Sequence, residues 1–189
     1  MSISAELTQR LAERGALLQG HFRLSSGRHS DRYISKFRIL EDPKLVEPLA
    51  AEIARAFADA RPTVVVSAAV GGIVLGYETA RSLGVSGIFV EKEDGRAVLR
   101  RGFALNARDR VLIVEDVVTT GLSVREVIDV VRATGAQVVG VGAIVVRGTA
   151  EFGVPTVALL HMPLESYDPS ECPLCAAEVP IDDPGSRRT

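Results

Sequence analysis

Two adjacent carboxylates and a short run of hydroxyl and glycine residues follow one another in residues 111–123. Glu115 and Asp116 come directly after an apolar run, and Thr-Thr-Gly-Leu-Ser occupies residues 119–123. Carboxylates accept hydrogen bonds from ligand hydroxyls or hold a metal. Hydroxyls and backbone N–H groups at the start of a helix bind anions instead. A ligand that suits both groups carries hydroxyls or a metal together with a phosphate, as a ribose 5-phosphate does.

The same stretch predicts a strand, a loop and a helix. Residues 111–114 are β-branched or aliphatic, and apolar residues recur at helical spacing from Leu122 to Val131. Open α/β sheets bind ligands at the carboxyl ends of their strands, which is where this strand delivers its acids. The alternative is a solvated strand end followed by a simple helix cap. A cap needs only one Ser or Thr, so the full series favours a ligand site.

Residues 111–123 resemble the phosphoribosyl pyrophosphate signature of the type I phosphoribosyltransferases: a hydrophobic strand, Glu-Asp, two spacers and Thr-Thr-Gly-x-Ser. The resemblance implies that the two acids hold the ribose hydroxyls and take part in catalysis. It also implies that the following loop holds the 5-phosphate, and that Mg²⁺ arrives through substrate and water without a direct protein ligand. The matching residues are Glu115, Asp116, Val117, Val118, Thr119, Thr120, Gly121, Leu122 and Ser123.

The rest of the chain predicts an α/β fold, with a doubly wound and mostly parallel sheet flanked by helices. Strands are expected near residues 64, 88, 112, 140 and 157, with helices between several of them. Asp42 and Pro43 suit the start of one helix, as cap and first-turn proline. We expect a single domain with an N-terminal hood at about 1–40, a core at about 41–161 and an irregular tail at about 162–189.

Two further segments match loops that cover pyrophosphate in the resembled family. Residues 68–72 read Ala-Ala-Val-Gly-Gly, and Gly71 and Gly72 would bring backbone N–H groups to the anion, although many members have a lysine at Gly71. Residues 91–102 predict a charged, flexible hairpin. Lys92 matches a family loop lysine with a catalytic role. Glu91 stands where an arginine is usual, and the family's Lys-x-His farther along is missing. These departures leave Arg96, Arg100 and Arg101 as candidate cations, with Arg100 assigned to the donor site.

Residues 22–30 carry the Phe-x-Leu-x-Ser-Gly-x-x-Ser pattern of the orotate-specific members of the family. The resemblance implies transfer of a phosphoribosyl group to orotate in pyrimidine (UMP) synthesis, with Ser26, Tyr33, Thr119 and Arg147 binding the base. Ser25 departs from a lysine found in many members. It further implies a homodimer in which the hairpin reaches the neighbouring subunit. The alternatives are a purine phosphoribosyltransferase and a non-catalytic regulator that binds RNA or DNA.

Composition limits the partners and the location. The net charge of −2 gives no electrostatic basis for binding nucleic acid or an anionic membrane, and no apolar run reaches about 20 residues, so we expect a cytoplasmic protein. Cys172 and Cys175 form Cys-Pro-Leu-Cys, which resembles one zinc knuckle. Zinc normally needs four ligands, and only His161 or a symmetry mate is expected to help, so two ordinary thiols are favoured.

Overall fold

The fold is described from a computed structural model, which describes residues 3–24, 26–163 and 165–184. The chain divides into two compact units, one from Met1–Ile39 and Pro163–Thr189 and the other from Leu40–Met162. Each unit is considered by itself. In the part of the chain that the structure describes, none of the helices combines the length and apolar character needed to span a membrane.

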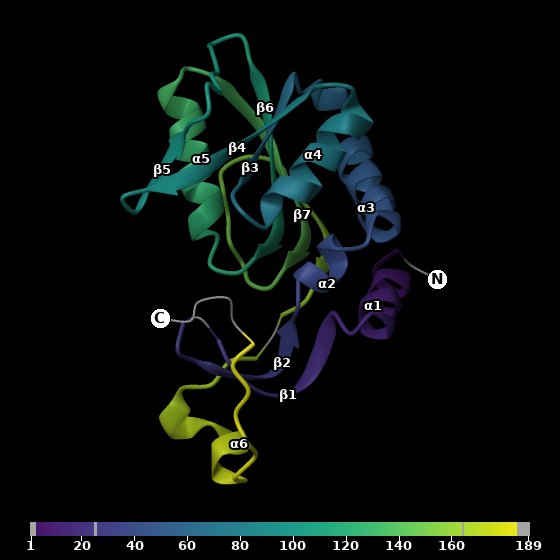
Figure 1. Ribbon diagram of the computed structural model, residues 1–189, viewed down its shortest axis with the longest axis vertical. Helices are drawn as coiled ribbons and strands as arrows, with labels where there is room; N and C mark the ends of the chain where they lie inside the picture. Colours follow the sequence, from purple (N-terminus) through teal and green to yellow (C-terminus); the bar gives the residue numbers. More distant parts are fainter. Residues whose placement is uncertain (1–2, 25, 164, 185–189) are drawn as a thin grey trace. The chain divides into compact units, whose positions relative to one another are not determined.

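The Leu40–Met162 unit is built on a six-stranded sheet with the order β5-β4-β3-β6-β7-β8 (Figure 1). All neighbouring strands are parallel except β4 and β5, which form an antiparallel hairpin. This arrangement confirms the predicted α/β class and its mostly parallel sheet. The strands are β3 (Val64–Ala68), β4 (Ser86–Glu93), β5 (Arg96–Leu99), β6 (Arg110–Val118), β7 (Gln137–Val146) and β8 (Thr156–His161).

Helices cover both faces of this sheet. The short α2 (Phe37–Leu40) precedes α3 (Pro43–Ala56), which lies with α4 (Gly72–Leu83) on one face, whereas α5 (Leu122–Ala133) lies on the other (Figure 1). The chain passes from β3 through α4 to β4 in one direction, and from β6 through α5 to β7 in the opposite direction. The strand order therefore reverses between β3 and β6, and open α/β sheets bind ligands at such a point.

The sequence explains the start of α3 and its tight packing on the sheet. Oδ1 of Asp42 accepts a hydrogen bond of 3.0 Å from the N–H of Lys44, so the predicted cap of α3 is confirmed. Strand β7 is apolar and largely buried, yet it contains Gly140 and Gly142. A Cβ atom at either glycine would overlap a side chain of the α3 segment, Phe57 at the first and Ile53 at the second. The glycines let α3 approach the sheet closely.

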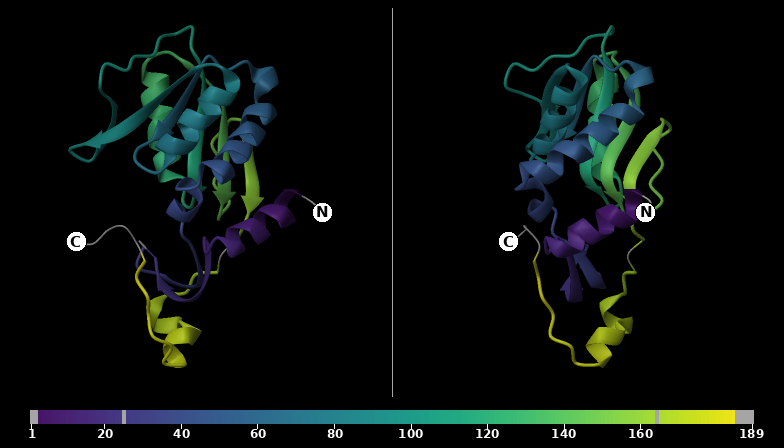
Figure 2. Two further views of the ribbon diagram at one scale, coloured as in Figure 1. Left: turned by 45° about the vertical axis from the view of Figure 1, so that its right-hand side comes forward. Right: turned by 90° about the vertical axis from the view of Figure 1, so that its right-hand side faces the viewer.

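The other compact unit combines the beginning of the chain with its last described segment. Helix α1 (Ile3–Glu13) leads into an antiparallel ribbon of β1 (Leu17–Arg23) and β2 (His29–Ile34). The C-terminal segment contains two short helical turns, η2 (Pro169–Glu171) and α6 (Pro173–Ala176). It is attached to the ribbon by backbone pairing of Tyr167 with His29 and of Asp182 with Phe22. Both views of Figure 2 show this segment beside the ribbon.

Candidate active site

The two predicted carboxylates lie at the end of β6, next to the end of β3. Glu115 and Asp116 are 7% and 2% exposed, although both are acids. The carboxylate of Glu115 accepts a hydrogen bond of 3.0 Å from the N–H of Asp116, and that of Asp116 accepts one of 2.6 Å from the N–H of Val117. Backbone donors thus fix the orientation of both side chains. Fixed, buried carboxylates are suited to hold ligand hydroxyls or to face a positive charge.

The loop after β3 closely approaches the first of these acids. Helix α4 begins at Gly72, where an added Cβ would lie 3.2 Å from Cβ of Ser67 and 3.4 Å from Oε1 of Glu115. The same loop is joined to β4, because the N–H of Ala69 donates a hydrogen bond of 2.8 Å to the carbonyl of Val90. The structure therefore brings the predicted pyrophosphate loop and the predicted ribose acids together at the switch point of the sheet.

The loop between β6 and α5 has the geometry of an anion site. Thr119, Thr120, Leu122 and Ser123 are exposed, whereas Gly121 is buried and has a φ of +78°. No side chain caps α5 at Gly121, although Oγ1 of Thr120 accepts a long hydrogen bond of 3.4 Å from the N–H of Leu122. Helix N–H groups and hydroxyls are thus presented together at the positive end of a helix dipole.

Arg125 holds this loop in place, and the sequence motif gave no indication of its role. One guanidinium nitrogen donates a hydrogen bond of 3.1 Å to the carbonyl of Thr120, and another donates one of 3.1 Å to the carbonyl of Glu151. The guanidinium also lies 5.3 Å from the ring centroid of Phe152. Since an added Cβ at Gly121 would lie 2.8 Å from Phe152 and 2.9 Å from Arg125, both side chains shape the loop.

Two of the four residues predicted to bind the base are close together. The N–H of Arg147, just after β7, donates a hydrogen bond of 2.9 Å to the carbonyl of Val118, at the end of β6. An added Cβ at Gly148 would lie 3.1 Å from the carbonyl oxygen of Thr119. The ends of β6 and β7 therefore join Thr119 and Arg147 through the backbone.

The other two residues predicted to bind the base, Ser26 and Tyr33, belong to the unit formed by Met1–Ile39 and Pro163–Thr189. Tyr33 lies on β2, and its ring centroid is 5.7 Å from that of Phe22 on β1. Ser26 is exposed in the turn between these strands, where its hydroxyl accepts a hydrogen bond of 3.5 Å from the N–H of Arg28. Ser25 lies outside the described residues.

The predicted charged hairpin is formed by β4 and β5, and residues of β4 form ion pairs with α5 and with the arginines that follow β5. Lys92 lies within β4, where Nζ is 2.8 Å from Oε1 of Glu126 on α5. Arg101 lies 3.0 Å from a carboxylate oxygen of Glu91, and that carboxylate is also 3.5 Å from Arg100. Glu91, which replaces an expected arginine, thus pairs with two of the candidate cations. Arg96 is exposed and lies opposite Glu93 in the ladder, and Glu93 also pairs with Arg100 at 3.2 Å.

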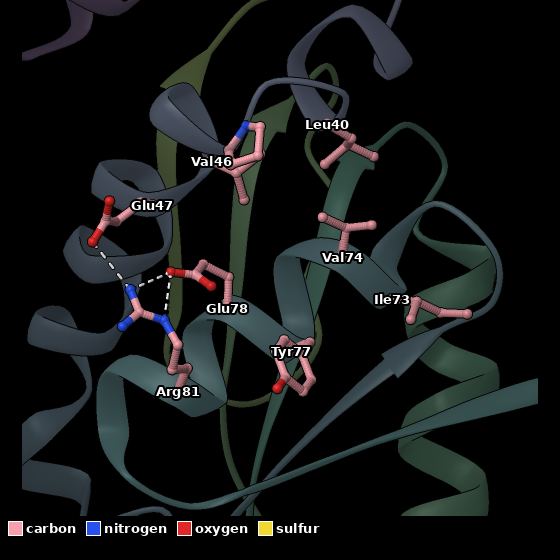
Figure 3. Close-up of a pocket in the computed structure, with 9 residues that line it drawn as sticks. Leu40, Val46, Glu47, Ile73, Val74, Tyr77, Glu78 and Arg81 are labelled. Carbon is pink, nitrogen blue, oxygen red and sulfur yellow. Dashed lines mark hydrogen bonds and ion pairs between the residues drawn. The ribbon is translucent and has the colours of Figure 1, made fainter.

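A separate apolar hollow lies between α3 and α4 and contains none of the predicted site residues. Its volume is about 530 Å³ (Figure 3). At one side, Arg81 lies 3.1 Å from Glu47 and 2.6 Å from Glu78. An apolar hollow whose lining arginine is already paired with two acids does not suit a phosphorylated ligand. The lining residues are Leu40, Pro43, Val46, Glu47, Ile73, Val74, Tyr77, Glu78 and Arg81.

The expectation that only His161 or a symmetry mate would assist Cys172 and Cys175 is wrong. His161, the residue expected to assist them, ends β8 in the Leu40–Met162 unit. The structure instead places His21 and His29 beside Cys172 and Cys175. Sequence reasoning missed these histidines because they lie in the β1–β2 segment, which was interpreted only as part of a base-binding hood.

Comparison with known proteins identifies the family of the chain. The model of the phosphoribosyl transferase domain family matches residues 38–154, which include both loops and the two acids. The chain therefore belongs to the phosphoribosyltransferase family.

More similar proteins identify the branch of that family. The chain is 48% identical over 185 residues to the orotate phosphoribosyltransferase of Desulforamulus reducens, covering 97% of each protein. It is 50% identical over 175 residues to that of Chlorobium phaeobacteroides strain BS1, covering 92% of this chain and 91% of the relative. The crystal structure of orotate phosphoribosyltransferase from Aeropyrum pernix superimposes with a TM-score of 0.69 at 30% identity, over 82% of this chain and 93% of that one. These relatives place the chain among the orotate phosphoribosyltransferases.

Proposed function

We propose that the chain transfers the 5-phosphoribosyl group of phosphoribosyl pyrophosphate to N1 of orotate, giving orotidine 5′-phosphate and pyrophosphate. One observation carries this proposal: a buried acid pair, an anion loop and Arg147 lie together at the carboxyl ends of the neighbouring strands β6 and β7. The names of the relatives point to the same reaction. The expected cytoplasmic location and role in UMP synthesis agree with it.

The acids and the anion loop have separate tasks in this reaction. The bond from ribose C1 to the pyrophosphate oxygen breaks, and its electron pair leaves with pyrophosphate while N1 of orotate bonds to C1 and releases its proton to pyrophosphate or water. Glu115 and Asp116 would hold the ribose hydroxyls and stabilise the positive charge that develops on the ring. Residues 117–123 would bind the 5-phosphate and fix the ribose for attack, with Thr119, Thr120 and Ser123 supplying hydroxyls.

The pyrophosphate would lie against the loop at Gly71 and Gly72, where small residues let backbone N–H groups approach. Mg²⁺ fits this arrangement, because it is commonly held by one or two carboxylates together with substrate phosphates. When bound, it would neutralise charge on the leaving pyrophosphate. Glu115 and Asp116 are the residues that would hold it, through the ribose hydroxyls or water.

Arg147 is proposed to recognise the carboxylate of orotate, for which a planar, two-pronged guanidinium is well suited. Thr119 would contact the base, because it is joined to Arg147 by neighbouring strand ends. The contributions of Ser26 and Tyr33 stay predictions from the family resemblance.

Lys92 and Arg100 are proposed to neutralise the leaving group. Both side chains are about half exposed and paired with acids, at 2.8 Å from Glu126 for Lys92 and 3.2 Å from Glu93 for Arg100. Exposed ion pairs are worth only about 0–1 kcal/mol, so binding of a pyrophosphate could replace them at small cost.

We also propose that the protein acts as a homodimer with the β4–β5 hairpin shared between subunits. Supporting this proposal, three large apolar residues in α4 and just before it are exposed, Val70 by 74%, Val74 by 47% and Tyr77 by 68%. Val74 and Tyr77 also line the apolar hollow between α3 and α4 (Figure 3). A second copy of the chain is the proposed cover for this surface.

The decisive experiment follows the absorbance of orotate after phosphoribosyl pyrophosphate and Mg²⁺ are added to the purified protein. Loss of the orotate signal that requires donor and metal is expected. Parallel reactions contain hypoxanthine, guanine, adenine or uracil. Turnover of a purine alone would replace the proposed base, and no turnover with any base would favour a nucleotide-sensing regulator.

A further inference from the structure

Four potential metal ligands from distant parts of the sequence meet in the unit formed by Met1–Ile39 and Pro163–Thr189. His21 lies on β1, His29 begins β2, Cys172 follows η2, and Cys175 lies in α6. One ligand atom from each residue lies within 4.8 Å of all the others. His21, His29 and Cys172 are 2%, 5% and 4% exposed, so the cluster is largely shielded from solvent.

The spacing of the four ligand atoms fits a tetrahedral metal centre. Sγ of Cys172 and Sγ of Cys175 lie 3.5 Å and 3.7 Å from Nε2 of His21, and Sγ of Cys175 lies 3.3 Å from Nδ1 of His29. The two imidazole nitrogens are 3.0 Å apart. Tetrahedral zinc, with bonds of about 2.3 Å to sulfur and 2.0 Å to nitrogen, separates a sulfur from a nitrogen by about 3.5 Å.

A neighbouring carbonyl prepares His21 for this role. Nδ1 of His21 lies 2.8 Å from the carbonyl oxygen of Val179. A carbonyl oxygen can only accept, so Nδ1 carries the proton and Nε2 presents its lone pair toward the cysteines. Histidines that bind a metal are commonly fixed in this way by a hydrogen bond from the other ring nitrogen.

Neither a disulfide nor a set of hydrogen bonds would engage the whole cluster well. A disulfide would employ the two cysteines, which are free thiols in the structure, but not the histidines. Hydrogen bonds among thiols and imidazoles are weak, and burying these polar groups together is costly unless each is satisfied. A metal would engage all four groups, and two cysteine and two histidine ligands in a tetrahedral arrangement are typical of structural zinc.

We propose that His21, His29, Cys172 and Cys175 bind one structural zinc ion. Four protein ligands would fill the coordination sphere, which is typical of structural and not catalytic zinc. The ion would fasten the C-terminal segment to the β1–β2 ribbon between its two backbone attachments, at Tyr167 with His29 and at Asp182 with Phe22. Small units that can bury little apolar surface commonly gain their stability from such metals.

The first test measures the metal content of the full chain, purified without added chelator, by inductively coupled plasma mass spectrometry. We expect about one zinc per wild-type chain, and a loss of most of it in Cys172→Ser and His29→Gln. His161→Gln is the matched control, because it removes the remaining histidine, which lies outside the cluster. Zinc that stays in the two cluster variants would overturn the proposal.

The second test uses wild-type protein alone, so it does not depend on the folding of a variant. The protein is treated with a chelator under reducing conditions and then titrated with Co²⁺. We expect strong visible bands of tetrahedral cobalt and a thiolate charge-transfer band, both displaced by one equivalent of zinc. A weak octahedral spectrum, or no uptake of cobalt by protein whose thiols are reduced, would overturn the proposal. Neither test measures the transferase activity, so each result is independent of the proposed reaction.

Discussion

The backbone N–H of Arg147 donates a hydrogen bond of 2.9 Å to the carbonyl of Val118, which joins the end of β7 to the end of β6. Through this bond, the residue proposed to select the base is anchored two residues from Thr120, in the loop proposed to hold the 5-phosphate. The residues proposed to select the base and to bind the donor thus lie at the neighbouring ends of β7 and β6 in one sheet. Substitutions at these strand ends are expected to separate the two tasks.

Arg147→Ala is expected to raise the KM for orotate on the order of 30-fold, because it removes hydrogen bonds to a charged group. The KM for phosphoribosyl pyrophosphate should change little, since the backbone bond to Val118 is kept. Steady-state kinetics with each substrate varied in turn measures the difference. Arg132→Ala, an exposed arginine in the last turn of α5, is the control. Equal effects on both KM values would remove Arg147 from the base site.

The double variant Glu115→Gln, Asp116→Asn should lower kcat by about 100-fold or more, because neutral amides stabilise a developing positive charge poorly. Both changes keep the shape of the side chain, so the far-ultraviolet circular dichroism spectrum should be retained. Kinetics at saturating substrate measures the loss. A folded variant with near-normal turnover would show that the acids do not act on the ribose.

Gly121→Ala should weaken donor binding and destabilise the protein. The φ of +78° costs an alanine about 1–2 kcal/mol, and its Cβ would meet Phe152 at 2.8 Å, which adds about 1–3 kcal/mol. Gly84→Ala is the matched control, since Gly84 has a φ of +69° but nothing within 4 Å of an added Cβ. Urea unfolding and the KM for the donor measure the two effects. Similar losses in both variants would mean that crowding at the loop is unimportant.

Lys92→Ala is expected to lower kcat about tenfold through loss of charge neutralisation at the leaving group. Glu126→Gln breaks the same 2.8 Å ion pair and should leave kcat unchanged. Neither change should alter stability by more than about 1 kcal/mol, because the pair is exposed. Parallel kinetics on the two variants provides the comparison. If both reduce kcat equally, Lys92 acts only through its pair with Glu126.

Tyr77→Asp should convert a dimer into monomers, because it places a charge on the exposed apolar surface of α4. Size-exclusion chromatography with light scattering measures the mass directly. Ser82→Asp adds the same charge at another exposed position of α4 and should leave the dimer intact. A dimer that persists in Tyr77→Asp would place the interface elsewhere.

Local patterns were sufficient to predict most of the fold and the centre of the proposed site. The acids, the anion loop and the start of α5 lie within residues 111–123, so one contiguous motif determines their arrangement. The predicted helix cap at Asp42 is equally local. Interactions between distant residues could not be predicted. Arg125 connects the carbonyl of Thr120 in the loop with the carbonyl of Glu151 and the ring of Phe152. Glu91 pairs with Arg100 and Arg101 only once the hairpin has formed.

The cysteine cluster shows the same limit most clearly. Nothing in the spacing of Cys172 and Cys175 indicates which histidines they meet, because His21 lies 151 residues before Cys172 in the chain. Antiparallel pairing of β1 and β2 first brings His21 and His29 together. The C-terminal segment then has to return to that ribbon before the four side chains can meet.

That return has a consequence for synthesis on the ribosome. The β1–β2 ribbon emerges early, but its partners come much later, for example the carbonyl of Glu165, which accepts a hydrogen bond from Ser30 across 135 residues. The Leu40–Met162 segment emerges in the meantime and can acquire its sheet first. The β1–β2 ribbon therefore lacks these partners until the C-terminal segment has been synthesised, so we expect the unit formed by Met1–Ile39 and Pro163–Thr189 to be completed last.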